Sequence, residues 1–139
     1  MSGGVRGTRG ATRVLREIAA PPMTEEQEQA CLAQYLDGLG LLWWHTPNGG
    51  KRGAVTAKKL KGAGVKAGVP DVFIASRLAK HPQARGAFVE LKRTHGGTVS
   101  PAQQEMIARL KAEGYLVHVA RGWQDAARWL ADECGVGRW

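Results

Sequence analysis

The chain has 139 residues, a length typical of one domain, and 43% of them are hydrophobic, which is enough for a buried core. Its 20 lysines and arginines outnumber its 12 acidic residues, and the formal net charge of +8 favours a polyanion over an acidic protein as partner. No apolar run approaches the roughly 20 residues of a membrane span, and the arginine-rich start lacks the apolar stretch of a secretory signal. We therefore expect a cytoplasmic protein with no membrane association. Cys31 and Cys134 lack zinc-site spacing and indicate reduced thiols.

Residues 1–20 form a basic segment that we separate from one domain over residues 21–139. No acidic residue precedes Glu17, and the segment mixes glycine, serine and threonine with arginines at Arg6, Arg9, Arg13 and Arg16. This composition predicts a mobile or weakly helical arm. The arm either contacts phosphates or has no specific role, and its composition favours the second interpretation.

A helix is predicted from Thr24, because Gln27 completes a capping box three residues later and Gly38 interrupts the pattern. Its apolar residues recur at helical spacing, at Cys31, Leu32, Tyr35, Leu36 and Leu39. Three glutamates fall in its first turn, where negative charge suits the helix dipole. One of them, Glu25 or Glu28, could also reach the carboxylate cluster described below, and the spacing leaves both open.

Residues 41–44 are an apolar Leu-Leu-Trp-Trp run that predicts a short strand. We expect Trp43 and Trp44 to belong to the core rather than to form platforms for stacking nucleobases. For His45, which follows the strand, we expect a core or strand-end position rather than a role toward substrate.

A stretch without acidic residues extends from Gly38 to Pro70. It includes a predicted short helix over residues 54–60, and its basic side chains are Lys51, Arg52, Lys58, Lys59, Lys61 and Lys66. A run of like charge is often only a solvated face. Because this run directly precedes the carboxylate cluster, we expect it to follow the phosphates of a nucleic acid.

Two apolar runs, residues 69–75 and residues 87–92, predict core strands. The connector between them, residues 77–85, is polar and contains a proline. It is too short for a crossover helix, so we expect the two strands to be antiparallel neighbours.

Each of these strands carries one carboxylate at a defined point. Asp71 opens the first strand directly after a proline, and Glu90 and Lys92 lie two positions apart in the second. Residues i and i+2 of a strand share a face, so Glu90 and Lys92 project together while Leu91 is buried on the other side. If the strands pair, Asp71 joins them. Two carboxylates and an ammonium group predict a divalent-metal site with a lysine beside the attacking water.

The rest of the chain predicts two further helices and a third core strand. Ser100 is the expected N-cap of the first helix, Pro101 suits its first position, and Gln103 completes a second capping box. The later elements are expected at residues 115–120 for the strand, residues 123–131 for the last helix and residues 135–139 for a tail.

Four stretches together resemble the VRR-NUC family of the PD-(D/E)xK nucleases. They are Asn48-Gly49-Gly50-Lys51-Arg52, Leu60-Lys61, the Gly-Val-Lys-Ala-Gly-Val-Pro-Asp run that ends at Asp71, and Ser100-Pro101-Ala102-Gln103. Pro70-Asp71 followed by Glu90-Leu91-Lys92 carries the PD-(D/E)xK signature itself. The likeness covers roughly residues 24–120 and is nearest to small stand-alone members from phages and bacteria. An isolated Pro-Asp and Glu-x-Lys pair recurs by chance, but the Gly-Val-Pro-Asp context followed by Ser-x-x-Gln is specific.

The resemblance implies an α/β fold with a restriction-endonuclease-like core, in which helices flank a central mixed sheet. It implies cleavage of DNA phosphodiesters with Mg²⁺ or Mn²⁺. Small family members act on branched DNA such as Holliday junctions, or on flaps, often as homodimers. Two other functions fit the basic residues: a non-catalytic DNA-binding accessory protein on the same fold, or a nickase in phage replication or packaging.

The resemblance also implies a role for individual residues. The implied metal ligands are Asp71, Glu90, the carbonyl of Leu91 and either Glu25 or Glu28. Lys92 would orient or activate the attacking water, and Gln103 would contact the site. The residues expected to contact DNA, whether branched or duplex, are Asn48, Lys51, Arg52, Lys58, Lys59, Lys61 and Lys66.

Overall fold

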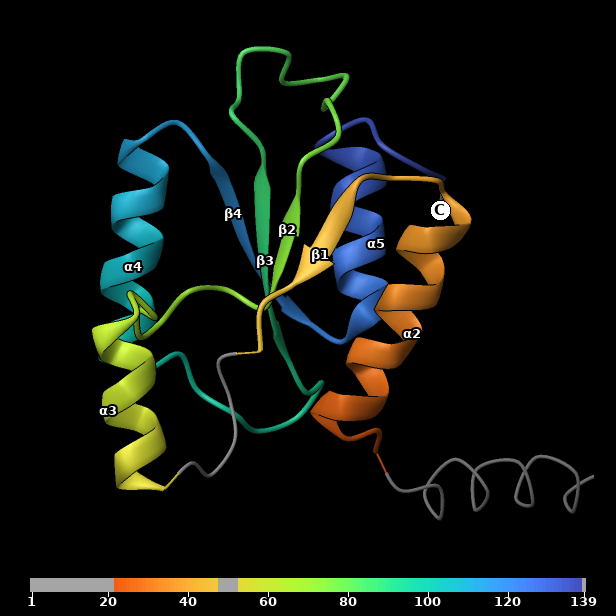
Figure 1. The fold of residues 1–139 in the computed structure, drawn as a ribbon. Coiled ribbons are helices and arrows are strands. Elements are labelled where there is room, and N and C mark those ends of the chain that lie inside the picture. The colour runs from red at the N-terminus through yellow and green to blue at the C-terminus, as the bar shows by residue number, and fades with distance from the viewer. Residues whose placement is uncertain (1–21, 48–52, 139) are drawn as a thin grey trace, which may run out of the picture.

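The computed structural model describes residues 22–47 and 53–138, which form a mixed sheet flanked by helices (Figure 1). The sheet has four strands in the order β1 (Trp43–His45), β2 (Val72–Ile74), β3 (Ala87–Lys92) and β4 (Leu116–Arg121). The first three strands are antiparallel neighbours, whereas β3 and β4 run parallel. The helices of the described residues are α2 (Glu25–Gly38), α3 (Ala54–Gly62), α4 (Pro101–Ala112) and α5 (Trp123–Asp132). The predicted α/β fold with a mixed sheet is confirmed.

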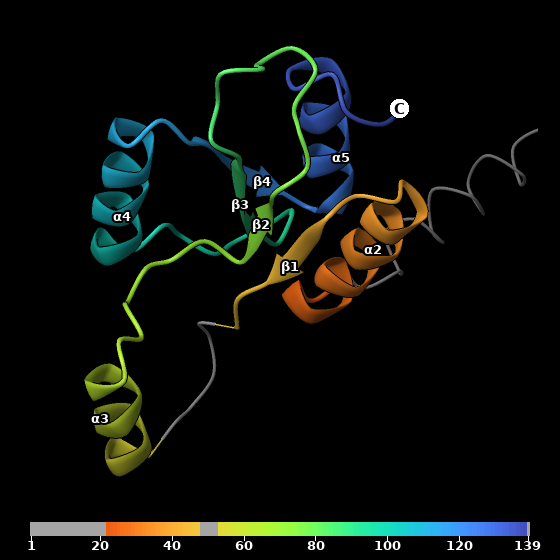
Figure 2. The same cartoon turned by 45° about the horizontal axis from the view of Figure 1, so that its top comes forward.

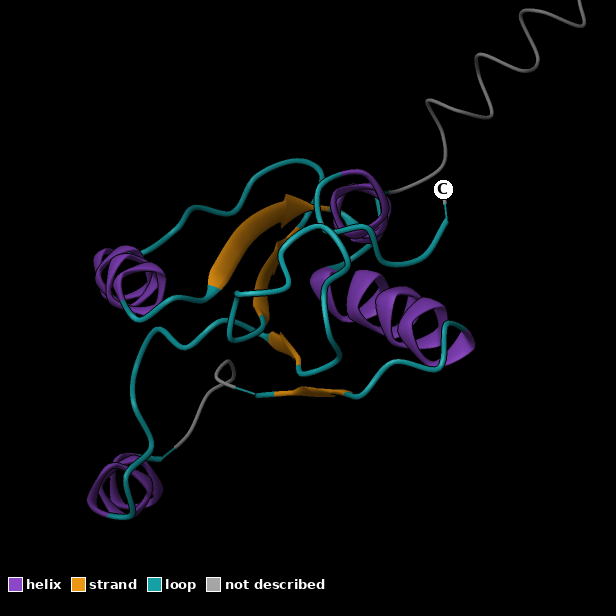
Figure 3. Cartoon of the chain, turned by 90° about the horizontal axis from the view of Figure 1, so that it is seen from above, coloured by secondary structure: helices purple, strands orange, loops and turns teal. Residues whose placement is uncertain are grey.

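The two faces of the sheet are covered unequally. Helices α2 and α5 lie together on one face, and α4, which links β3 to the parallel strand β4, lies on the other (Figure 3). Helix α3 stands away from the sheet on the side of α4, and none of its residues is buried (Figure 2). None of the helices in the described ranges is long and apolar enough to cross a bilayer.

The core lies between the sheet and the pair of helices α2 and α5. Its fully buried side chains include Leu32 and Leu36 of α2, Val89 of β3 and Leu130 of α5. Val89 reaches this layer because alternate residues of β3 point toward α2 and α5. Burial of the apolar stripe of α2 therefore fixes which face of β3 points away from these helices.

Sequence signals located most elements to within a few residues. The capping boxes of Thr24 with Gln27 and of Ser100 with Gln103 are both present, and α2 and α4 begin directly after them. The antiparallel pairing of β2 with β3 is also confirmed. β2 is shorter than the predicted residues 69–75. The basic arm predicted over residues 1–20 lies outside the described residues.

The segment after α5 is not the tail that we expected over residues 135–139. Val136 is only 8% exposed and packs in the core beside the free, buried thiol of Cys134. The hydroxyl of Tyr35 in α2 donates a hydrogen bond to the carbonyl of Arg138 at 2.8 Å. The backbone N–H of Val136 also donates to the carbonyl of Leu130 at 2.8 Å, so the segment is held against both α2 and α5.

The expectation that both tryptophans of β1 are core residues is wrong for Trp44. Trp43 packs against the core, and its indole N–H donates to Asp37 of α2 at 2.8 Å. Trp44 is 49% exposed. Neighbouring strand residues point to opposite faces, and the helices α2 and α5 cover only the face that receives Trp43.

We predict that Leu36→Ala lowers the free energy of unfolding by about 2–5 kcal/mol, because it leaves a cavity in a fully buried layer. Leu42→Ala is the matched control: Leu42 is 64% exposed, so its loss should change stability by less than about 0.5 kcal/mol. Urea unfolding followed by circular dichroism measures both. A loss as small for Leu36→Ala as for Leu42→Ala would contradict the packing of α2 on the sheet.

Candidate active site

Asp71, Glu90 and Lys92 lie together where β2 begins and β3 ends. The register pairs Val72 with Val89, so the residue before β2 falls beside Glu90. The carboxylate of Asp71 accepts a hydrogen bond from the backbone N–H of Leu91 at 2.8 Å. Within β3, the ammonium of Lys92 is 3.2 Å from Glu90 Oε1. The structure thus brings together the two carboxylates and the lysine that the sequence placed at one point.

Gln103 joins this group from the first turn of α4. Its amide nitrogen donates to Glu90 Oε1 at 2.8 Å, and its amide oxygen accepts from Lys92 Nζ at 3.3 Å. The same oxygen accepts the backbone N–H of Ser100 at 2.9 Å, which is half of the capping box. One side chain therefore both begins α4 and orients the charged groups of β3.

Gly68 allows the loop before Asp71 to pass this helix. Its φ is +81°, and a Cβ there would lie 2.4 Å from the carbonyl oxygen of Ala102 in α4. Only glycine combines this backbone conformation with such a close approach. The glycine of the Gly-Val-Pro-Asp run is thus required sterically, because the run passes close to the start of α4 before Asp71 reaches β3.

Burial makes it costly for both carboxylates of the site to carry a negative charge. Glu90 is 3% exposed, and its second oxygen, Oε2, is buried without a hydrogen-bond partner. Burial and the neighbouring charge of Asp71 raise the pKa of Glu90 to about 7, although Lys92 opposes the shift. Burial also raises the pKa of Asp71, against the Leu91 N–H bond and the charges of His45 and Lys92. A divalent cation would relieve both effects, so these residues fit a metal ion.

The two candidate glutamates of α2 have different surroundings. Glu28 is buried, and its Oε2 accepts the backbone N–H of Trp123 at 2.7 Å, so it caps α5. Glu25 is exposed, and its charge helps to raise the pKa of Asp71. Its Oε1 is 3.5 Å from the position of a Cβ on Gly97, in the loop that follows β3. The geometry favours Glu25 as the glutamate that faces the site.

His45 is the last residue of β1, which agrees with the strand-end position expected for it, and it also contacts the backbone of Asp71. Its Nδ1 is 2.8 Å from the carbonyl oxygen of Asp71, which also accepts the N–H of Thr46 at 2.7 Å. Because a carbonyl only accepts, Nδ1 carries the hydrogen in this geometry. This contact follows from the pairing of β1 with β2, which sets His45 opposite Val72 and which was not predicted from the sequence.

The predicted DNA-contacting residues that the structure describes lie apart from the carboxylates. Lys58, Lys59 and Lys61 are exposed on α3, and Lys66 is exposed in the loop that follows. The remaining three, Asn48, Lys51 and Arg52, lie outside the described residues. Figure 1 shows that α3 projects at the end of the molecule where β2 begins. These lysines therefore flank the carboxylate cluster at a distance.

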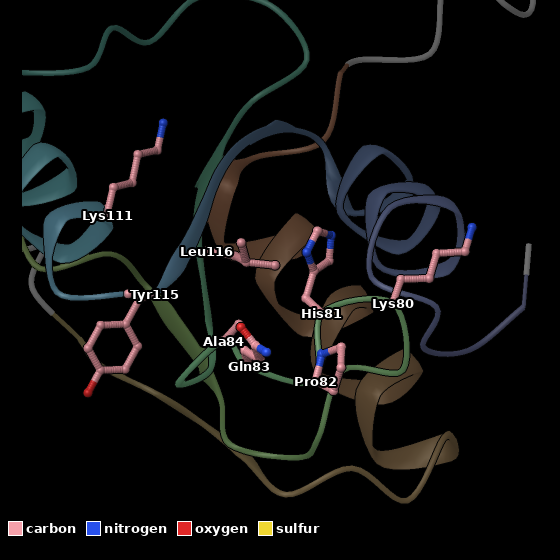
Figure 4. A pocket seen from close by; sticks show the side chains of 9 residues that line it. Lys80, His81, Pro82, Gln83, Ala84, Lys111, Tyr115 and Leu116 are labelled. Atoms are coloured by element: carbon pink, nitrogen blue, oxygen red, sulfur yellow. The ribbon is translucent and has the colours of Figure 1, made fainter.

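A hollow of about 580 Å³ lies at the opposite end of the sheet, beside the start of β4 (Figure 4). His81, Gln83 and Leu116 are among its lining residues. Lys80 points outward from it, and its ammonium donates to the carbonyl of Asp132. The hollow shares no residue with the carboxylate cluster. Within the described ranges, no three His, Cys, Asp or Glu side chains gather as a metal centre, so a cation at Asp71 and Glu90 needs backbone or water oxygens as well.

Comparison with known proteins identifies the arrangement. The model of the VRR-NUC domain matches residues 23–124. A solved structure described as a VRR_NUC domain protein is 26% identical and superposes with a TM-score of 0.66. That match covers 84% of this chain and 93% of the other. No curated protein matches the chain significantly.

We predict that the metal-free protein loses stability as pH rises toward neutrality, because Glu90 must then ionise in a buried site. Its folded pKa of about 7 exceeds the ordinary value of 4.5, so the folded protein keeps a proton that the unfolded chain releases between these values. This contribution is complete below the unfolded pKa and is lost as pH rises through the folded pKa. The loss should be about 3 kcal/mol at most.

Urea unfolding in EDTA across this pH range measures the effect. Glu90→Gln keeps an oxygen for Gln103 and Lys92 but cannot ionise, so its stability should depend less on pH than that of the unchanged protein. Equal slopes for the two proteins would contradict the raised pKa of Glu90.

Proposed function

The chain belongs to the VRR-NUC family and is therefore a nuclease-type protein that acts on DNA, and from this premise we propose a metal-dependent endonuclease that hydrolyses phosphodiester bonds. The observation that carries the proposal is the unpartnered, buried Oε2 of Glu90 beside Asp71. A buried carboxylate oxygen without a hydrogen-bond partner is costly, and a metal ion is a partner that would satisfy it.

Asp71, Glu90 and the backbone carbonyl of Leu91 would hold the metal. The N–H of Leu91 points to Asp71, and in an antiparallel pair the N–H and C=O of one residue face the same neighbouring strand. Glu25 would contribute through water or directly. Mg²⁺ or Mn²⁺ suits oxygen ligands of this kind, and Mg²⁺ commonly retains several waters. A bound divalent cation would polarise the scissile phosphate and lower the pKa of a coordinated water.

Lys92 would act on the negative charge that develops during hydrolysis. Its ammonium is held at 3.2 Å by Glu90 and at 3.3 Å by Gln103, so its position is fixed before substrate binds. Preorganised charge of this kind stabilises a transition state without reorganisation at the moment of reaction. Gln103 would keep both Glu90 and Lys92 in place, since its amide reaches each of them.

We propose that α3 binds the DNA backbone beside the cut, because its lysines are exposed and the helix stands apart from the sheet. The proposal extends to branched substrates, either Holliday junctions or flaps, and to a homodimer that cuts two strands, as the likeness to the small family members implies. A nickase would share the same residues and differ only in the cutting pattern. A non-catalytic DNA-binding protein would retain the basic residues but would not need the buried carboxylates.

We predict that Asp71→Asn lowers cleavage at least about 100-fold in Mg²⁺ or Mn²⁺, because metal-ion catalysis contributes several kcal/mol. Glu105→Gln, an equally conservative change at an exposed position of α4, should leave the rate unchanged. The assay uses four-way junction, flap and duplex DNA. Equal activity of Asp71→Asn and Glu105→Gln would show that Asp71 does not belong to the active site. DNA binding by the wild type without cleavage would favour the accessory protein, and single nicks in place of paired cuts would favour the nickase.

We predict that replacing Lys58, Lys59 and Lys61 together by alanine weakens DNA binding and reduces the salt dependence of log Kd by about 3, near one unit per phosphate contact. Anisotropy titrations over a range of salt concentrations measure this slope. The matched control removes the same charge at the far end of the sheet, from Arg85, Arg109 and Lys111. A control slope that falls as much as the α3 slope would show that only the net charge matters.

A further inference from the structure

Four aromatic side chains form a continuous aromatic strip on the face of the sheet that α4 covers only in part. They are Trp44 of β1, Phe73 of β2, Phe88 of β3 and Tyr115 before β4. The ring centroids are 4.7 Å apart for Trp44 and Phe73, 4.6 Å for Phe73 and Phe88, and 5.3 Å for Phe88 and Tyr115. The strip therefore crosses the sheet from its edge strand to the strand beside α4.

The aromatic strip and the carboxylates share this face. Phe73 lies two residues after Asp71, and Phe88 lies two residues before Glu90, so strand alternation points each pair to the same side. Two residues of a strand span about 7 Å. Phe73 and Phe88 thus lie about 7 Å along their strands from the carboxylates, and Trp44 lies across from Phe73 on the neighbouring strand.

The strip ends at a ring that is open to solvent. Trp44 is 49% exposed, while the other three rings are only partly exposed. Its inner side contacts Phe73, and the ring of Phe73 is itself set by Gly86, where a Cβ would lie 2.7 Å from it. β1 is an edge strand, with no further strand beyond Trp44 in the described sheet. The indole is therefore fixed from within and free to receive a flat partner.

The surrounding charge indicates the chemistry of that partner. The chain has a net charge of +8, and the exposed lysines of α3 and Lys66 lie at the same end as the carboxylates. A polyanion that carries flat aromatic groups is a nucleic acid, and bases stack on aromatic side chains without sequence preference. Bases within a duplex are already stacked on each other, so only an unpaired base can reach Trp44.

We propose that Trp44 stacks an unpaired nucleobase next to the scissile phosphate, so that the preferred substrate carries unpaired nucleotides at the cut. The inference rests on the proposed endonuclease function and specifies its substrate class. The bases of a continuous duplex would leave Trp44 without a stacking partner, whereas a flap or an opened branch point supplies one. Trp44 therefore contributes to substrate selection and not to the chemical step.

The test measures DNA binding in EDTA while the protein and the DNA are changed singly and together. Wild type, Trp44→Ala, Trp44→Phe and the exposed-residue control Leu42→Ala are titrated with flap DNA whose unpaired arm is intact or abasic at each of the first four nucleotides. Trp44→Ala should bind the intact flap about tenfold more weakly. Wild type should lose the same factor with one abasic position, and Trp44→Ala should lose nothing further there. Trp44→Phe should bind nearly as the wild type does, and Leu42→Ala should be unchanged.

Two results would overturn the proposal. Equal losses for Trp44→Ala on intact flap, abasic flap and duplex DNA would mean that no base stacks on the ring. A halved mass in solution for Trp44→Ala, without any effect of abasic positions, would mean that a second copy of the chain covers it. Thermal unfolding of each variant controls for folding. Because the test measures binding alone, a wild type that never cleaves DNA would refute the endonuclease while leaving the stacking result intact.

Discussion

The antiparallel pairing of β2 with β3 holds two carboxylates side by side, one of them, Glu90, buried and the other, Asp71, half-buried. Asp71 and Glu90 cannot separate, because the Leu91 N–H fixes one of them and strand register fixes the other. Both have raised pKa values for this reason, and Lys92 compensates only in part. Lys92 therefore does not balance the charge of the two carboxylates, and a divalent cation would supply the positive charge that is missing.

The second support of the site comes from α4. Gln103 is a helix-capping residue that also contacts Glu90 and Lys92, so the start of this helix and the geometry of the charges are set by the same side chain. Gly68 allows the loop that carries Asp71 to pass directly beneath that turn. Helix α4, the loop and β3 thus position one another, and a shift in any of them would move the reacting groups.

Local signals in the sequence were sufficient for most of the fold and for the centre of the site. Strand alternation placed Glu90 beside Lys92, and the capping boxes located two helices. Signals that depend on distant partners were not readable. Trp44 is exposed because α4, the helix on its face of the sheet, contacts β4 and leaves β1 uncovered. Glu28 is occupied because Gly122, the N-cap of α5, has no side chain to cap that helix. No residue near these positions in the sequence carries that information.

The capping of α5 by Glu28 links segments that are synthesised far apart in time. The bond joins residues 95 positions apart, so it forms only after nearly the whole domain has emerged from the ribosome. Until then, the apolar stripe of α2 can pack on the strands that precede α5 but lacks α5 itself, and the nascent chain leaves that part of the stripe exposed to other proteins. Completion of α5 is thus the event that closes the domain, and a chain interrupted before Trp123 would leave a buried acid without its partner.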